Sequence, residues 1–348
     1  MRFALFDWLD ATGRDLADTY QQRLEMLELA DKAGFYCYHI AEHHATPLSM
    51  VPSPNLFLAA ASQRTSRIRL GVLAYLLPFY QPLRLLEEIA MMDQLTRGRL
   101  EVGLSRGASP FEMATYGLEA EHSRDMFNEA LDIILTGLSS GRIDHHGAYY
   151  QYDNVETRLR PVQQPYPPLW YPTSNKDSIP WLASQGLSTV FAAHLAPTLD
   201  EARQMLQIYD QELTAHSGDG KRLNGHIKDP NYGLSFHVHV AETDRQAVAQ
   251  ARESWKHFFE NFSYLWVKHG QASRFEHRND FDQMLGEGKF LVGSPATVRE
   301  QLSRAYQGAK ANYFVGSFCW GSFTPEQVLT SIDLFAREVM PELQLATA

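Results

Sequence analysis

The sequence predicts an α/β protein folded as a single (β/α)8 TIM-like barrel with insertion loops. Short β-rich runs alternate with longer stretches of helical periodicity, which is typical of parallel strands joined by crossover helices. The runs number eight, and no GxGxxG motif follows the first of them, which disfavours a doubly wound nucleotide-binding sheet. A chain of 348 residues fits one such barrel, so residues 1–348 are expected to form one domain.

The expected elements follow one another in regular order. The first helix, Asp18–Ala33, is amphipathic and has Gly34 as a C-terminal stop signal. Further helices are expected at Asn55–Gln63 and at Leu83–Leu95, the latter opened by Pro82. The eight expected strands are residues 2–6, 37–40, 68–74, 100–104, 168–171, 188–193, 232–243 and 312–318.

Two stretches depart from the repeat and are expected to be insertions. Residues 139–167 are rich in Gly, Tyr and Pro, and residues 270–292 mix charged residues with glycines without clear periodicity. Their composition is equally consistent with active-site lids and with irregular connectors.

Composition and charge exclude several classes of protein. The formal net charge of -10 argues against an extended nucleic-acid surface, which needs clustered Lys and Arg. No apolar run approaches membrane-spanning length, and the N-terminus becomes acidic too early for a signal peptide. Cys37 and Cys319 form no CxxC pair, which disfavours a disulfide framework. We therefore expect a cytoplasmic enzyme that binds neither nucleic acid nor membrane.

Active sites of such barrels lie at the C-terminal ends of the strands, so the residues after each run are the first candidates. Glu42, His43 and His44 follow the second run. Adjacent side chains of an extended segment point apart, which disfavours a metal ion shared by both histidines. Histidine titrates near neutrality and suits proton transfer, although a hydrogen-bonded structural histidine is an equally simple interpretation.

His237 and His239 form a second candidate because alternate residues share one face of a strand. No third ligand is identifiable after a neighbouring run, and Ser235 on the same face indicates a polar barrel interior. Lining of a pocket is therefore favoured over metal binding, and no metal is expected.

Two further segments are candidates for binding a phosphate group. Arg106 follows the fourth run beside Ser105, and it either grips a phosphate or forms a surface ion pair. Ser174 and Asn175 lie where a helix is expected to begin, and Ser178 adds a hydroxyl. This second segment is typical both of anion binding and of simple helix capping.

Aromatic and apolar residues after the strands are candidates for a substrate wall, although residues at such positions often only complete a core. The candidates for this wall are Trp8, Phe79, Tyr80, Met113 and Trp320, which all follow barrel strands. The expected substrate pocket consists of Trp8, Phe79 and Trp320 together with Glu42, His44, Ser105 and His237.

Four segments together resemble the bacterial luciferase-like flavin-dependent monooxygenases. They are "AEHHAT", "RIRLGVLAYLLPFYQPLRLLEEIAMMDQLTRGRLEVGLSRG", "PVQQPYPPLWYPTSN" and "LFAREVMPEL", in the family's order and over nearly the whole chain. The resemblance implies a TIM-like barrel that takes reduced FMN from a separate NAD(P)H-dependent flavin reductase. A C4a-peroxyflavin formed with O2 would then oxygenate a small, apolar organic substrate. The family's habits also imply a homodimer.

The resemblance assigns roles to individual residues. His43 stands at the catalytic histidine, Arg106 at the arginine that grips the flavin phosphate, and Asn175 with Ser178 on the phosphate-binding turn. Leu73-Ala74 stands at an unusual peptide linkage behind the flavin, for which a cis bond is predicted.

Two positions depart from the pattern of luciferase itself. Ser174 replaces a glutamate of the luciferase α subunit, and Ser105 replaces its reactive cysteine. Thiol-dependent behaviour and light emission therefore do not carry over.

Two alternatives remain open on the same barrel. One is a reductase or dehydrogenase that uses the deazaflavin F420, which does not support the same oxygen chemistry. The other is a non-catalytic flavin-binding protein. The Glu-His-His segment at Glu42–His44 favours FMN.

Overall fold

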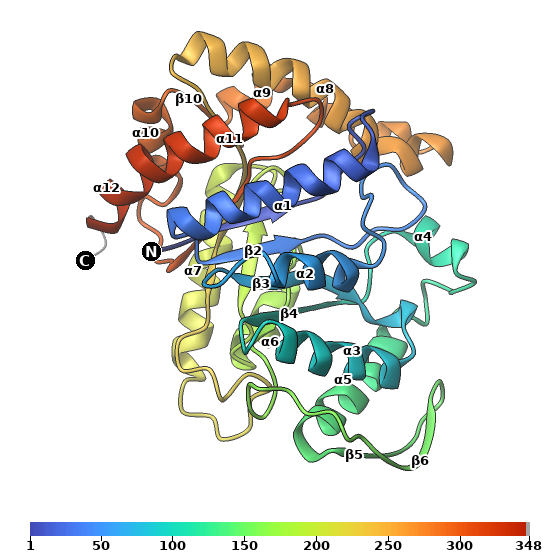
Figure 1. Cartoon of the computed structure of the whole chain (residues 1–348). Coiled ribbons are helices and arrows are strands. Elements are labelled where there is room, and N and C mark those ends of the chain that lie inside the picture. The colour runs from blue at the N-terminus through green and yellow to red at the C-terminus, as the bar shows by residue number, and fades with distance from the viewer. Residues whose placement is uncertain (346–348) are drawn as a thin grey trace.

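Eight parallel strands form the centre of the molecule (Figure 1). The computed structural model describes residues 1–345, so the last three residues of the expected domain lie outside the described range. The strands follow one another in the ring as β1 (Arg2–Asp7), β2 (Cys37–Ile40), β3 (Arg69–Leu76), β4 (Leu100–Ser105), β7 (Leu169–Trp170), β8 (Thr189–Ala192), β9 (Tyr232–Val240) and β11 (Tyr313–Ser317). These are the eight runs that the sequence predicts, and the α/β, TIM-like fold class is confirmed.

The ring is joined at both of its ends. Strand β11 pairs with β1, with Arg2 opposite Tyr313. Between β7 and β8 the regular ladder gives way to one isolated parallel bridge, where the Ser188 amide donates to the Leu169 carbonyl at 3.0 Å. All pairings in the ring are parallel, so the C-terminal ends of the strands lie at one end of it.

Three strands were not predicted. Strand β10 (Phe290–Gly293) pairs with the second half of β9, beyond the part that β8 occupies. It ends the segment 270–292, which also contains short helical turns and α9 (Phe281–Gly286). The segment 139–167 contains an antiparallel hairpin of β5 (Arg142–His146) and β6 (Gln151–Glu156). Strand β10 is only four residues long, and β5 and β6 consist mainly of charged and polar residues, so none of them leaves a clear hydrophobic period in the sequence.

Helices cover the outside of the ring, and Figure 1 shows α1, α2 and α3 beside strands β1 to β4. The expected helices are present as α1 (Leu16–Ala33), α2 (Pro54–Ser62) and α3 (Pro82–Leu95), and Gly34 ends α1 in a left-handed conformation (φ 87°). The others are α4 (Pro110–Thr115), α5 (Ser123–Ser140), α6 (Ile179–Ser184), α7 (Leu199–Ala215), α8 (Asp244–Lys268), α10 (Pro295–Ala305) and α11 (Pro325–Leu334), which continues through a π-helical turn into α12 (Met340–Leu345).

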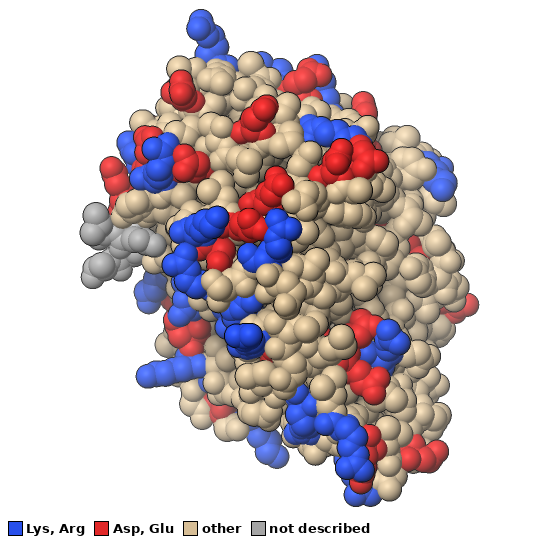
Figure 2. Space-filling model, viewed as in Figure 1, with Lys and Arg blue, Asp and Glu red and all other residues tan. Residues whose placement is uncertain are grey.

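The surface mixes charges of both signs. Figure 2 shows acidic and basic side chains interspersed over one face of the molecule. Within residues 1–345, no helix is both long and apolar enough to cross a membrane.

Large side chains fill the N-terminal half of the ring. Glu101 on β4 is buried, accepts a hydrogen bond from the Trp170 indole at 2.6 Å and forms an ion pair with Arg69. Nearby, His39 and the Tyr313 hydroxyl are 2.8 Å apart. Because this end of the ring is filled, the cavity inside the ring lies toward the C-terminal ends of the strands.

Asp10 ties the loop after β1 to two distant segments. Its fully buried carboxylate accepts hydrogen bonds from the Asn261 amide on α8 at 2.9 Å and from the Gly321 backbone amide at 3.1 Å. Burial raises the pKa of Asp10 to about 7.

This buried carboxyl group predicts a pH-dependent stability. The folded-state pKa lies above the ordinary value of 3.8, so the folded chain keeps a proton that the unfolded chain has lost. The contribution of Asp10 to the free energy of unfolding should fall by up to about 4 kcal/mol as the pH rises from about 4 to about 7. Asp10→Asn mimics the protonated form and should remove this slope, whereas the exposed Asp18→Asn should not. Urea unfolding at pH 5 and at pH 7.5 measures the free energy of unfolding of wild type and of both variants. An equal change in this free energy between the two pH values in wild type and in Asp10→Asn would contradict the prediction.

Gly103 on β4 predicts a second effect on stability. A Cβ atom there would lie 2.4 Å from the Val72 carbonyl oxygen and 3.0 Å from the Leu73 Cα, and backbone atoms cannot easily move aside. Gly103→Ala should therefore lower the free energy of unfolding by about 1–3 kcal/mol. Gly286→Ala, with open space around the new methyl group, is the control and should not destabilise the protein. Denaturation midpoints of the two variants test the difference.

Candidate active site

A mainly apolar cavity of about 250 Å³ opens at the C-terminal ends of the barrel strands. Eight of the residues singled out from the sequence line it: Trp8, Glu42, His43, Leu73, Ala74, Ser105, Ser174 and His237. Its other lining residues include Phe6, Ala108, Glu112, Val190, His194, Ser235 and Ser317. The structure thus brings together side chains from β1, β2, β3, β4, β8, β9 and β11 at one place.

His43 is held at the rim of this cavity by two contacts. Its Nδ1 lies 2.9 Å from Oε1 of the buried Glu112, which is on α4, and its ring stacks on Trp8 with 5.5 Å between ring centroids. A carboxylate acceptor at Nδ1 favours the tautomer that carries the proton there, which leaves Nε2 as a hydrogen-bond acceptor. Glu112 and Trp8 therefore fix the orientation of the His43 ring at the cavity.

The helix that carries Glu112 is itself fixed near its N-terminus. Ser109 caps it by accepting a hydrogen bond from the Glu112 amide. Phe111 stacks on His269 at 4.2 Å and meets Trp266 edge-on at 5.1 Å, at the far end of α8. The Glu112 carboxylate also accepts from the His44 amide at 3.3 Å. Sequence reasoning missed Glu112, although the Ser-Pro-Phe-Glu pattern after the fourth strand is a helix-start signal.

His44 lies beneath the cavity and does not line it. It is buried, with Nε2 2.8 Å from Oε1 of Glu42 and Nδ1 2.9 Å from the Tyr116 hydroxyl. Phe79 stacks on its ring at 5.3 Å. Burial raises the pKa of Glu42, while the contacts with His44 and Tyr80 oppose that rise. His44, Phe79 and Tyr80 thus support the segment that positions His43.

Leu73 and Ala74 form part of one cavity wall, and the peptide bond between them is cis, as predicted. The backbone of Gly103 packs closely against this bond. Ser105 lies near it, two residues further along β4, and accepts a hydrogen bond from the Gly107 amide at 3.1 Å.

The expected phosphate site adjoins this cavity. A second cavity of about 300 Å³ shares Ser174, Ala192 and Leu195 with the first and is also lined by Asn175 and Lys176. The Lys176 ammonium, which the sequence did not single out, is paired with Glu201 at 3.0 Å. The second cavity therefore extends the first into a more polar region.

The structure shows the capping alternative at Asn175, whereas Ser178 and Arg106 lie outside both cavities. The Asn175 side chain accepts from the Asp177 amide and caps a single helical turn, Lys176–Ser178. Ser178 lines neither cavity. Arg106 is exposed, lines neither cavity and forms no ion pair among the described residues, so the surface-pair interpretation of this arginine is wrong.

Two apolar candidates lie in the core instead. Trp320 is 1% exposed, stacks on Phe290 and does not line the cavity. Met113 is buried under Gly107. An aromatic or apolar residue after a strand can point either into the mouth of the barrel or behind it, which the sequence does not decide.

His237 is fully buried and lines the cavity, as expected. His239 instead faces Gln250, with Nε2 and Oε1 2.8 Å apart, and stacks on Phe323. His194 lies beside His237, and the rule that residues after a strand come first could have identified it.

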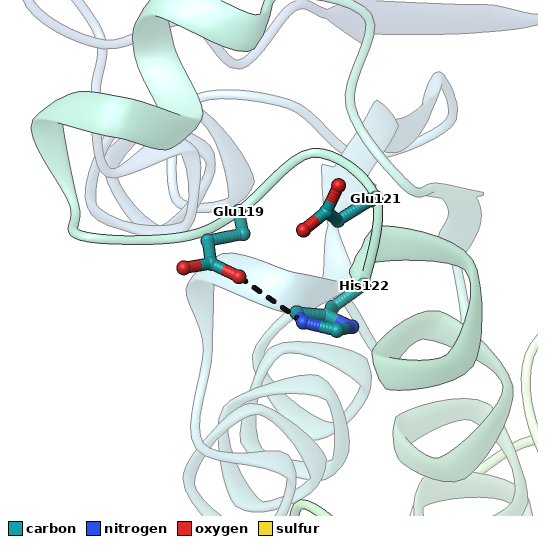
Figure 3. Close-up of side chains that lie close together, drawn as sticks. All are labelled: Glu119, Glu121 and His122. Carbon is teal, nitrogen blue, oxygen red and sulfur yellow. Dashed lines mark ion pairs between the residues drawn. The ribbon is translucent and has the colours of Figure 1, made fainter.

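One group of side chains within residues 1–345 has its ligand atoms close enough for a metal ion: Glu119, Glu121 and His122 (Figure 3). All three are exposed and come from the loop before α5, and the His122 imidazole is paired with Glu119 at 3.1 Å. They line neither cavity, and exposed acidic groups commonly cluster without binding a metal.

Comparison with known proteins identifies the class to which this site belongs. Residues 1–312 match the family described as luciferase-like monooxygenase. The oxygenase component of the flavin-dependent trigonelline monooxygenase of Acinetobacter baylyi is 28% identical over 273 residues, which cover 77% of this chain and 72% of that protein. The chain belongs to the luciferase-like monooxygenase family, and the resemblance seen in the sequence is confirmed.

Two solved structures share the fold over nearly their whole length. The oxygenating constituent of 3,6-diketocamphane monooxygenase from Pseudomonas putida, in complex with FMN, is similar with a TM-score of 0.80, 20% identity and 98% coverage of both chains. The coenzyme F420-dependent tetrahydromethanopterin reductase of Methanopyrus kandleri is similar with a TM-score of 0.70, 16% identity and coverage of 98% of this chain and 99% of its own. The fold alone therefore does not decide between the two cofactors.

The contact between His43 and Glu112 predicts a measurable tautomer. Glu112→Gln replaces a carboxylate by an amide that can donate as well as accept, so the Nε2-protonated form of His43 should become populated. The ¹⁵N resonances of His43 should shift accordingly in histidine-labelled protein. Glu119→Gln, in the exposed loop, is the matched control. Unchanged His43 resonances in Glu112→Gln would show that Glu112 does not select the tautomer.

Proposed function

We propose that the protein is the oxygenase component of a two-component monooxygenase, which uses reduced FMN and O2 to oxygenate a small, largely apolar organic molecule. The observation that carries this proposal is the apolar cavity at the barrel mouth with one oriented histidine, His43, at its rim. The cavity walls carry apolar side chains over most of their area, which suits chemistry that water would interrupt.

The residues present fit a bound flavin. The first cavity provides the flat apolar wall of Leu73 and Ala74 for the ring system. The adjoining cavity provides Ser174 and Asn175 for a phosphate-bearing tail, together with the Lys176 ammonium, which is paired with Glu201. Arg106 lines neither cavity, so a role in holding the phosphate would require its exposed side chain to turn toward the site.

The chain's own groups have distinct tasks in this proposal. FMN in its reduced form supplies the electrons that activate O2. The apolar walls exclude water from the reacting atoms, and His43 accepts or returns a proton at Nε2 while Glu112 holds Nδ1. In this proposal reduced FMN comes from a separate NAD(P)H-dependent flavin reductase, which is supported by the relative that is named as an oxygenase component. A homodimer is part of the same proposal.

The F420-dependent reductase is the second candidate, and the similarity to the Methanopyrus kandleri enzyme supports it. The relative of higher sequence identity is named as flavin-dependent and as an oxygenase component, which favours the first proposal. A flavin-binding protein without turnover would not need the buried Glu112 behind His43.

An anaerobic titration with reduced FMN and reduced F420 tests the choice of cofactor. Reduced FMN should bind, and later mixing with O2 should consume it. Preferential binding of F420 would transfer the protein to the reductase class. Binding of reduced FMN, followed by oxidation no different from that of free reduced FMN and by no oxygenated product from any candidate substrate, would leave only the non-catalytic alternative.

Substitution of His43 tests its catalytic role. His43→Ala should bind reduced FMN within about twofold of wild type but lower the rate of substrate oxygenation by about 100-fold or more, because the proton-transfer group is lost. His122→Ala, which removes an exposed histidine outside both cavities, should retain full activity. Normal turnover by His43→Ala would remove this residue from the mechanism.

A further inference from the structure

The cavity wall opposite Leu73 and Ala74 has a chemical character that the proposed function leaves unexplained. Leu73 and Ala74 are on β3, and strands four positions apart in a ring of eight lie on opposite sides of it. Strand β9 therefore lies opposite β3, and β11 lies opposite β4. His237 on β9 and Ser317 on β11 are register partners, and His194 follows β8 beside them. These three residues, here called the polar wall, all line the cavity.

None of the hydrogen-bonding side-chain atoms of the polar wall has a partner within residues 1–345. These atoms are both ring nitrogens of His194, both ring nitrogens of His237 and the Ser317 hydroxyl oxygen. The three residues are 6%, 0% and 3% exposed, respectively. Buried polar atoms in proteins are nearly always hydrogen-bonded, so their concentration on one wall of a cavity points to a ligand.

The polar wall carries no charge at neutral pH. Burial lowers the pKa of His194 to about 3, with Arg278 and Lys289 adding to the effect. Burial also lowers the pKa of His237 well below its ordinary value. The wall therefore offers neutral donors and acceptors and provides no counter-charge for a carboxylate or an ammonium group.

The ring of His237 is held in one orientation by its surroundings. Phe258, Trp255 and Trp320 meet it edge-on, with centroid separations of 4.7, 5.3 and 5.4 Å. His194 lies nearly perpendicular to it at 4.7 Å. Such packing fixes the directions of the free nitrogens, so the wall can select a ligand by the position of its polar atom.

We propose that the polar wall recognises the organic substrate through an uncharged oxygen group, a ketone carbonyl or a hydroxyl, carried on an otherwise apolar molecule. A carbonyl oxygen accepts hydrogen bonds from an imidazole N–H or from the Ser317 hydroxyl, and a substrate hydroxyl can in addition donate to an imidazole nitrogen. The inference rests on the proposed function, which places the flavin against Leu73 and Ala74 and leaves the opposite wall to the substrate.

Four probes of similar ring size test the recognition. ¹⁵N-histidine-labelled protein, both with and without added FMN, is titrated with cyclohexanone, cyclohexanol, methylenecyclohexane and cyclohexanecarboxylate. The ketone and the alcohol should bind and shift the resonances of His194 and His237. The hydrocarbon should bind roughly fivefold to tenfold more weakly, as expected for one lost hydrogen bond. The carboxylate should bind least.

Variants assign the effect to the polar wall. His237→Phe keeps the aromatic packing but removes both nitrogens, and it should abolish the preference for the ketone over the hydrocarbon while the Kd for FMN stays within about twofold. His239→Phe is the matched control, because His239 lies on the same strand but outside both cavities; it should preserve the preference. Ser317→Ala applies the same test with a smaller change should His237→Phe fail to fold.

The outcomes separate this inference from the proposed function. Equal affinity of wild type for the ketone and the hydrocarbon, tighter binding of the carboxylate, or loss of FMN binding in His237→Phe and Ser317→Ala would each overturn the inference. Ketone binding that depends on His237 in a protein with no affinity for FMN would refute the proposed function and still support the polar wall.

Discussion

The buried ion pair of Glu101 and Arg69 is the constraint on which the location of the cavity depends. Burial raises the pKa of Glu101, and Arg69 and the Trp170 indole oppose that rise by stabilising the carboxylate. Arg69 also donates to the Leu100 carbonyl at 3.0 Å and to the Gln163 side chain at 2.8 Å, so both partners of the pair are well satisfied. Removal of one partner from such a pair leaves an uncompensated buried charge. These side chains fill the N-terminal end of the ring, and the cavity lies toward the other end.

Most of the barrel could be predicted from the sequence because its strands are continuous buried runs. Strands such as β2 and β9 consist almost entirely of buried residues, and turn signals bound them. Strand β10 and the β5–β6 hairpin were missed because four apolar residues, or two exposed strands, carry no distinct period. Their positions depend on tertiary pairing rather than on local preference.

The site was predictable one residue at a time but not as an arrangement. His43 and the cis bond at Leu73-Ala74 follow from the family motif. The partner of His43 lies 69 residues away in sequence, and no local pattern links the two positions. Likewise, the sequence does not predict that Trp320 packs against His237 outside the cavity. An aromatic residue at the end of a strand can point either into the cavity or into the core.

The short helix α4 contacts both His43 and the C-terminal end of α8. Phe111 packs against Trp266 and His269 at that end of α8, and the next residue, Glu112, sets the orientation of His43. Phe111 and Glu112 are neighbours on α4, so the contact with Trp266 and His269 and the contact with His43 depend on the same turn of helix. A displacement of that turn would change both contacts together.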